Sequence, residues 1–160
     1  MGHLGFSYVG LAYLLLLFAP NLLWTRRKPP GYDGASRLEN RVLLTLERIG
    51  EICVTACAVI FSDFNLQPPA PWCLWLGASA LLMLLYEGCW ARYFLTGCTW
   101  AGFYGRLGPV PVPLAVLPVA AFLLLGVYGK VVWMALSALV LGVGHIGIHL
   151  GHAREGRNLQ

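Results

Sequence analysis

The chain has 160 residues, of which 58% are hydrophobic and only 11% are charged, and its formal net charge is +4. A soluble domain of this length needs more charged residues to cover its surface, so the composition excludes an ordinary soluble domain. The mean hydropathy is +0.68, and the apolar residues form blocks of about twenty, the length that spans a bilayer as a helix. These features predict an integral membrane protein.

Five apolar blocks predict an all-α bundle of five transmembrane helices, which forms a single integral membrane domain over residues 1–160. The predicted spans are 4–24, 42–61, 72–94, 112–128 and 131–151. The short turn at Gly129 and Lys130 makes the last two spans an antiparallel hairpin. Prolines at positions 109, 111, 113 and 118 leave open a four-span arrangement with a re-entrant fourth segment.

Basic residues predict the orientation of the bundle, because loops on the cytoplasmic side carry an excess of Lys and Arg. Most of them follow the first, third and fifth spans, and only Lys130 lies on the opposite side. They are Arg26, Arg27, Lys28, Arg37, Arg41, Arg92, Arg106, Arg154 and Arg157. We therefore expect an outer N-terminus and an inner C-terminus in a multi-pass protein of the cytoplasmic membrane, with lipids as partners. No basic segment is interleaved with aromatic residues in a soluble domain, so nothing supports nucleic-acid binding.

The fifth predicted span carries His145, His149 and His152 on one stripe, because offsets of four and seven residues nearly superimpose on a helix. Ionisable groups in a membrane helix face protein, water or a bound ion rather than lipid. The spacing of His145 and His149 also suits two imidazoles that hold one metal ion. The stripe lacks the glutamate that follows the first histidine in helical zinc hydrolases. The alternative to a metal site is therefore that these histidines only make structural hydrogen bonds.

Two other spans bring carboxylates to this region, with Glu47 and Glu87 at a depth similar to that of the histidines and Glu51 deeper in the bilayer. Glu47 and Glu51 lie on one face of the second span with Arg48 beside them, and Glu87 is the only ionisable residue in the apolar part of the third. Two carboxylates four residues apart repel each other unless they share a cation or a proton. We expect these groups and the histidines to form a ligand- or proton-binding site that opens to the cytoplasm or inner leaflet. An internal ion pair of Arg48 with Glu51 or Glu87 is the structural alternative.

A metal ion is a further option for this site, and zinc or iron are the candidates. His145 and His149 would be two ligands, and Glu87 or Glu51 could supply a third. The five cysteines contain no Cys-x-x-Cys pair, so small buried side chains are the favoured interpretation for them.

Five spans in a chain of this length resemble the architecture of the translocator-protein family. The resemblance stops there, because the tryptophan- and proline-rich motifs of that family are absent from this sequence. The paired membrane aspartates of lipoprotein signal peptidases and the Cys-x-x-Cys of quinone-linked disulfide enzymes are absent too. No functional residue is therefore carried over from a known family.

Three functions fit these patterns. The first is a protein that binds or transports a small polar or amphipathic ligand or ion with proton coupling. The second is a metal-dependent membrane enzyme that acts on a lipid-like substrate at the inner leaflet. The third is a non-catalytic accessory subunit whose polar cluster only holds the helices together. The sequence also allows a homo-oligomer.

Overall fold

A computed structural model describes residues 2–32 and 40–158, and every regular element in these ranges is helical. The long helices in the described ranges are α1 (Tyr8–Trp24), α3 (Arg41–Ile60), α4 (Leu74–Leu95), α6 (Pro113–Tyr128) and α7 (Val132–Asn158). The short elements are η2 (Ser62–Phe64), η3 (Pro71–Cys73) and α5 (Trp100–Tyr104). The all-α prediction is confirmed for these residues, and each predicted span overlaps one long helix.

Two helical stretches among the described residues are long and apolar enough to cross a membrane. They are Pro71–Leu95 and Val132–Glu155. Helices α1 and α6 are apolar but shorter, at 17 and 16 residues, and α3 carries Glu47, Arg48 and Glu51 among its apolar residues. By length and composition, two helices could therefore cross a membrane, and the five-span arrangement stays a prediction.

Local sequence signals set the starts of the helices. The Ser7 hydroxyl accepts a hydrogen bond from the Gly10 N–H at 2.9 Å and caps α1, and the Asn40 side chain caps α3 in the same way. Helix α6 begins with Pro113 at its first position, where proline costs no backbone hydrogen bond. From there α6 is one continuous helix that contains Pro118.

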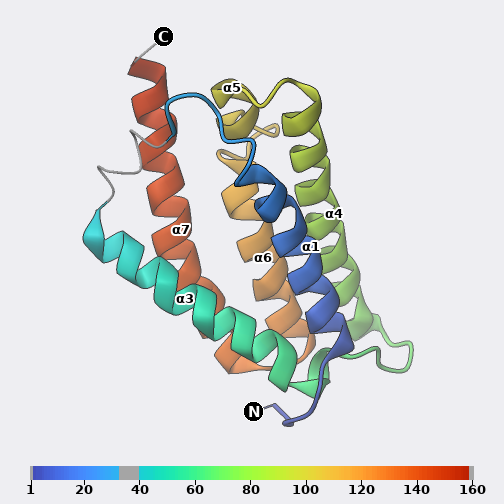
Figure 1. Cartoon of the computed structure of the whole chain (residues 1–160). Coiled ribbons are helices and arrows are strands. Elements are labelled where there is room, and N and C mark those ends of the chain that lie inside the picture. Colours follow the sequence, from blue (N-terminus) through green and yellow to red (C-terminus); the bar gives the residue numbers. More distant parts are fainter. Residues whose placement is uncertain (1, 33–39, 159–160) are drawn as a thin grey trace.

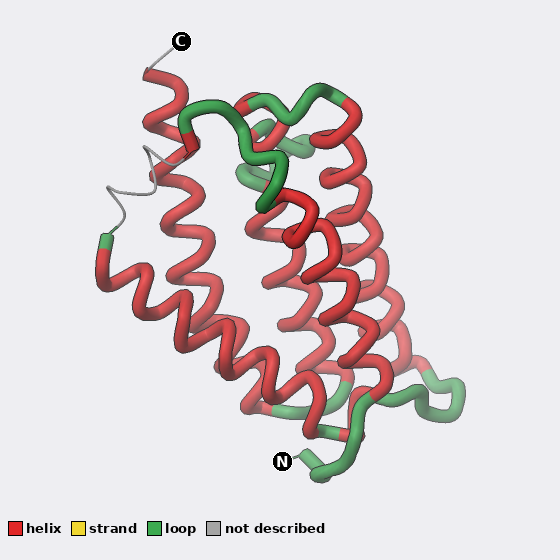
Figure 2. The backbone as a smooth tube through the Cα atoms, in the orientation of Figure 1, coloured by secondary structure: helices red, strands yellow, loops and turns green. Residues whose placement is uncertain are grey.

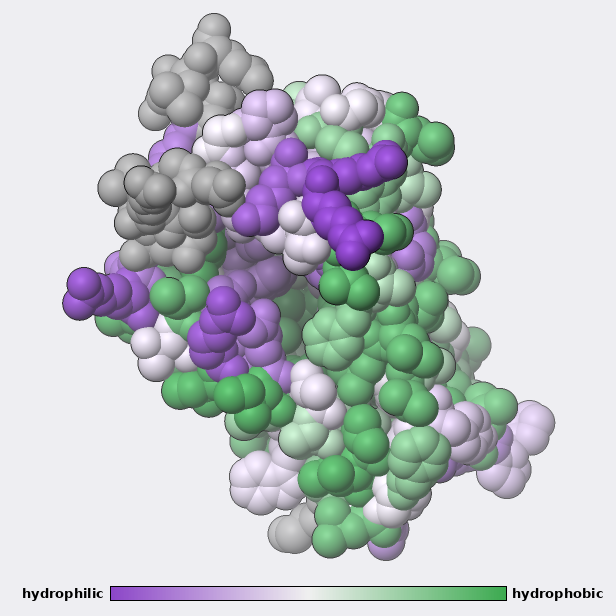
Figure 3. Space-filling view, in the orientation of Figure 1, coloured by the Kyte–Doolittle hydropathy of each residue, from purple (hydrophilic) through white to green (hydrophobic). Residues whose placement is uncertain are grey.

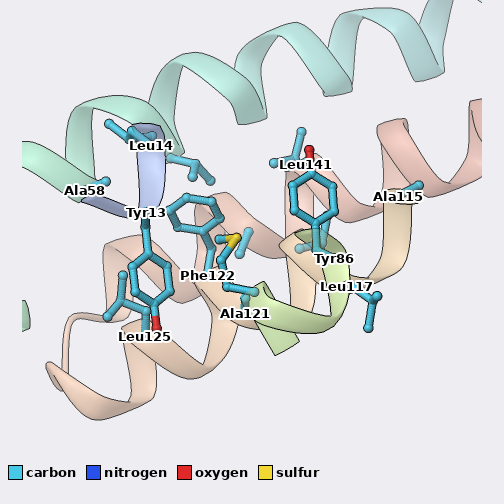
Figure 4. Close-up of a cluster of buried hydrophobic side chains, with 14 of the residues drawn as sticks. Tyr13, Leu14, Ala58, Tyr86, Ala115, Leu117, Ala121, Phe122, Leu125 and Leu141 are labelled. Carbon is cyan, nitrogen blue, oxygen red and sulfur yellow. The ribbon is translucent and has the colours of Figure 1, made fainter. Parts of the chain in front are cut away.

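Helix α6 forms the core of the bundle, and most of its side chains are buried. It packs against α4 and α7, α7 packs against α3, and α1 contacts both α3 and α4 (Figure 1). The connecting segments gather at the two ends of the bundle (Figure 2). Buried side chains from all five helices meet in the centre, among them Tyr13, Ala58, Tyr86, Phe122 and Leu141 (Figure 4).

Helix α3 touches its neighbours closely at glycines. A Cβ atom on Gly10 of α1 would lie 1.7 Å from the Ala58 carbonyl oxygen, so α1 and α3 meet backbone to backbone near one end. Towards its N-terminal end α3 slants away from α1 (Figure 1). The first half of α3 and the last turns of α1 line a shared cavity.

The segment before α1 is fastened to the loop after α3 at the end of the bundle opposite the C-terminus (Figure 1). The His3 ring nitrogen Nδ1 lies 2.8 Å from the Asp63 carboxylate, and the His3 backbone N–H donates to the same group. Burial raises the pKa of Asp63, but the hydrogen bonds from His3 outweigh this effect, so the pKa lies below its ordinary value.

Candidate functional site

The site is built where α3 and α7 come closest. A Cβ atom on Gly144 would lie 2.3 Å from the Glu47 backbone nitrogen, and a Cβ atom on Gly50 would lie 2.5 Å from the Leu141 backbone. Only glycine at these positions allows the two backbones to approach so closely. Because His145 directly follows Gly144, its ring is held beside the Glu47 side chain.

Glu47 and His145 form a short hydrogen bond at this crossing. The distance from His145 Nδ1 to Glu47 Oε1 is 2.6 Å, and the two side chains are 24% and 12% exposed. A carboxylate that accepts from one ring nitrogen fixes the tautomer and the orientation of the imidazole. This hydrogen bond holds the His145 ring against the Glu47 carboxylate.

His149 lies one turn further along α7. The ring centroids of His145 and His149 are 4.5 Å apart, and one ligand atom from each of Glu47, His145 and His149 lies within 4.8 Å of the other two. The His149 ring also packs against Phe103 and Tyr104 of α5, at centroid distances of 5.9 and 5.8 Å. Helix α5 therefore covers the end of this cluster.

Two adjoining cavities meet at the cluster. The inner cavity has a volume of about 220 Å³ and mostly apolar walls. Its apolar lining includes Leu17, Phe18, Trp90, Val119, Phe122 and Leu141. Its polar lining is Asn21, Glu51, Thr55, Tyr86, His145 and His149, of which the Asn21 amide donates to the Tyr86 hydroxyl at 2.8 Å.

The outer cavity, of about 210 Å³, lies between the last turns of α1 and the first half of α3. Its polar lining includes Glu47, Arg48 and Glu51. Figure 3 shows hydrophilic side chains around a hollow in this region, next to a largely hydrophobic surface over α1 and α4. Asn21, Glu51, Phe103 and both histidines line both cavities, so the two cavities adjoin at the histidines.

The structure brings most of the predicted site residues together. Glu47, Glu51, His145 and His149 all line the outer cavity, and Arg48 lines it while it is paired with Glu51 at 3.0 Å. This pair is one of the two ion pairs that the sequence allowed for Arg48. Both of its side chains are at least 44% exposed, so the pair contributes little to stability.

Glu87 lies elsewhere. It lines neither cavity and is outside the Glu47–His145–His149 group. Its Oε1 atom is buried without a hydrogen-bond partner among the residues that the structure describes. The structure therefore places Glu47, and not the expected Glu87 or Glu51, beside the two histidines. His152 is outside the group, and its Nδ1 lies 3.0 Å from the Tyr104 hydroxyl.

Tyr86, Trp90 and Phe103 line the inner cavity but were not predicted as site residues. Tyr86 and Trp90 are four residues apart and so share one face of α4, which the sequence alone could have indicated. Phe103 lies in the short helix α5, and no local pattern singles it out.

Comparisons of the chain with known protein families, with curated proteins and with solved structures found no match. The functional argument therefore depends on the geometry of the site.

Proposed function

We propose that the chain is a five-span membrane protein that binds a small amphipathic molecule in the inner cavity. The observation that carries this proposal is a cavity with mostly apolar walls whose polar lining includes two histidines, one of which is hydrogen-bonded to Glu47. Ligand pockets commonly combine apolar walls with a few convergent polar groups. An alkyl tail would lie among Leu17, Phe122 and Leu141, and a polar head would lie at the histidines.

The membrane arrangement is supported by two features of the surface. Many large apolar side chains are exposed along the outer faces of the helices, such as Leu22, Ile52, Leu84 and Val143, where a bilayer would cover them. The described basic residues, except Lys130, lie on α3 or in segments at the end of the bundle that holds the C-terminus (Figure 1). This distribution favours a cytoplasmic position for that end.

The short helix α6 is compatible with this arrangement. Sixteen residues extend about 24 Å, less than the hydrocarbon layer of about 30 Å. Because α6 is surrounded by the other helices, its ends are covered by protein rather than by lipid. The cavity would then lie in the inner half of the bilayer and open sideways, between α1 and α3, towards the inner leaflet.

Fluorescence quenching tests ligand binding. Trp90 lines the inner cavity and is 3% exposed, whereas Trp133 is 59% exposed on the outer face of α7. We expect ω-bromoundecanol to quench the purified protein saturably, and undecanol to reverse the quenching. The saturable component should be lost in Trp90→Phe and retained in the control Trp133→Phe. Quenching that rises linearly, or that is identical in the two variants, would show that the cavity is not a binding site.

A further inference from the structure

The polar end of the cavity has the donor set of a metal site. We infer that Glu47, His145 and His149 bind one zinc ion, whose fourth coordination position faces the inner cavity. Catalytic zinc sites have three protein ligands of this kind and an open position for water or substrate. The inference deepens the proposed function. It rests on that function for the identity of the ligand that would occupy the open position.

The distances suit an ion of this size. Bonds of about 2.0 to 2.2 Å to a tetrahedral zinc ion place its ligand atoms about 3.3 Å apart. The widest separation in the group is 4.8 Å, and the Glu47–His145 separation is 2.6 Å. Changes of up to about 1.5 Å in these separations, made by side-chain rotation, would bring the three ligand atoms to the distances of zinc ligation. Bonds to the ion would then replace the hydrogen bond between His145 and Glu47. The backbone crossing at Gly144 remains as it is.

His149 is the observation that distinguishes a metal site from a structural hydrogen bond. A Glu47–His145 pair needs no third polar group, yet His149 lies in ring contact with His145. Among the described residues His149 makes no side-chain hydrogen bond, and its side-chain contacts are with aromatic and imidazole rings. An imidazole in this setting has a ring nitrogen available for a ligand.

The open position would select an anionic head group. Without the ion, Glu47 and Glu51 repel a carboxylate. A divalent cation reverses the local charge and offers a direct bond to an oxygen atom. We therefore expect an alkyl carboxylate to bind in the inner cavity only when zinc is present, whereas an alcohol of the same length binds in either case.

Metal analysis of the purified full chain tests the ion itself. We expect one zinc per chain in the wild type. Zinc affinity should be at least about 100-fold lower in Glu47→Gln and His149→Ala, because removal of a group that only supports a metal ligand already lowers metal affinity about 10- to 100-fold. The control variants Glu87→Gln and His3→Ala should bind as the wild type does. Equal affinity in His149→Ala, or no zinc in the folded wild type, would overturn the inference.

Two further measurements keep the test independent of folding defects and of the proposed function. With cobalt in place of zinc, His149→Cys should gain a thiolate-to-cobalt charge-transfer band if position 149 is a ligand. A cobalt-loaded variant without the band contradicts the site. Quenching by ω-bromoundecanoate with and without zinc then separates the two proposals. Zinc binding without any quenching overturns amphiphile binding alone, and quenching by ω-bromoundecanol without zinc binding overturns the metal site alone.

Discussion

Substitution of Gly144 by alanine should separate α3 from α7 and disturb the site without removing any of its polar groups. The new Cβ atom would lie 2.3 Å from the Glu47 backbone nitrogen and 2.6 Å from the Leu43 carbonyl oxygen. Ordinary van der Waals contact begins at 3.4 Å, so the helices must move apart locally by about 1 Å. The obstructing atoms belong to the backbone, and no side-chain rotation can relieve the clash.

The cost follows from the same geometry. Overpacking of a tight contact destabilises a protein by about 1 to 3 kcal/mol, whereas alanine itself is favoured over glycine in a helix by about 1 kcal/mol. Gly151 on the same helix is the matched control, because a Cβ atom there meets nothing within 4 Å. We expect Gly151→Ala to be neutral or slightly stabilising. Gly144→Ala should be less stable than this control by about 1 to 3 kcal/mol.

Unfolding of both variants in detergent, followed by circular dichroism, measures this difference. A shift of about 1 Å would also lengthen the Glu47–His145 contact from 2.6 Å towards the limit of a hydrogen bond. Zinc affinity should therefore fall in Gly144→Ala and not in Gly151→Ala. If the two variants unfold alike and bind zinc alike, the close crossing of α3 and α7 is refuted.

Three further predictions concern other parts of the molecule. When single-cysteine variants are expressed in intact cells, a membrane-impermeant thiol reagent should label Cys73 directly and Cys98 only after permeabilisation. The reverse labelling pattern would contradict the proposed orientation. Folding lowers the pKa of Asp63, so the contact of Asp63 with His3 stabilises the folded chain fully at pH values above the unfolded carboxyl pKa of about 3.9. This stabilisation is lost as the pH falls through the lower pKa of the folded state. Protease cleavage of the N-terminal segment should accordingly rise in acid, and Asp63→Asn should be cleaved readily at every pH. Ser79→Ala removes a buried 2.6 Å hydrogen bond from α4 to the Ala121 carbonyl of α6. This substitution should lower the free energy of unfolding by about 1 kcal/mol, and an unchanged value would show that the bond contributes nothing to stability.

Local sequence patterns were sufficient for the helices and for the contacts within one helix. Each apolar block overlaps one long helix, because helix length and apolar composition are properties of a short stretch of chain. The stacking of His145 on His149 and the Arg48–Glu51 pair follow from spacings of four and three residues. Pro113 likewise marks the start of α6. The sequence alone therefore determined the all-α class and the composition of each helix face.

The partner of the histidines was decided only by tertiary packing. The sequence placed Glu47 and Glu87 at similar depths and Glu51 deeper, but depth does not say which helices are neighbours or how each is rotated. Close contact at Gly50 and Gly144 joins α3 to α7 and brings Glu47 to His145, whereas α4 packs against α6 and α1 and keeps Glu87 away. Small residues allow two helices that are distant in the sequence to pack closely when their surfaces are complementary in shape. No periodicity within one helix contains that information.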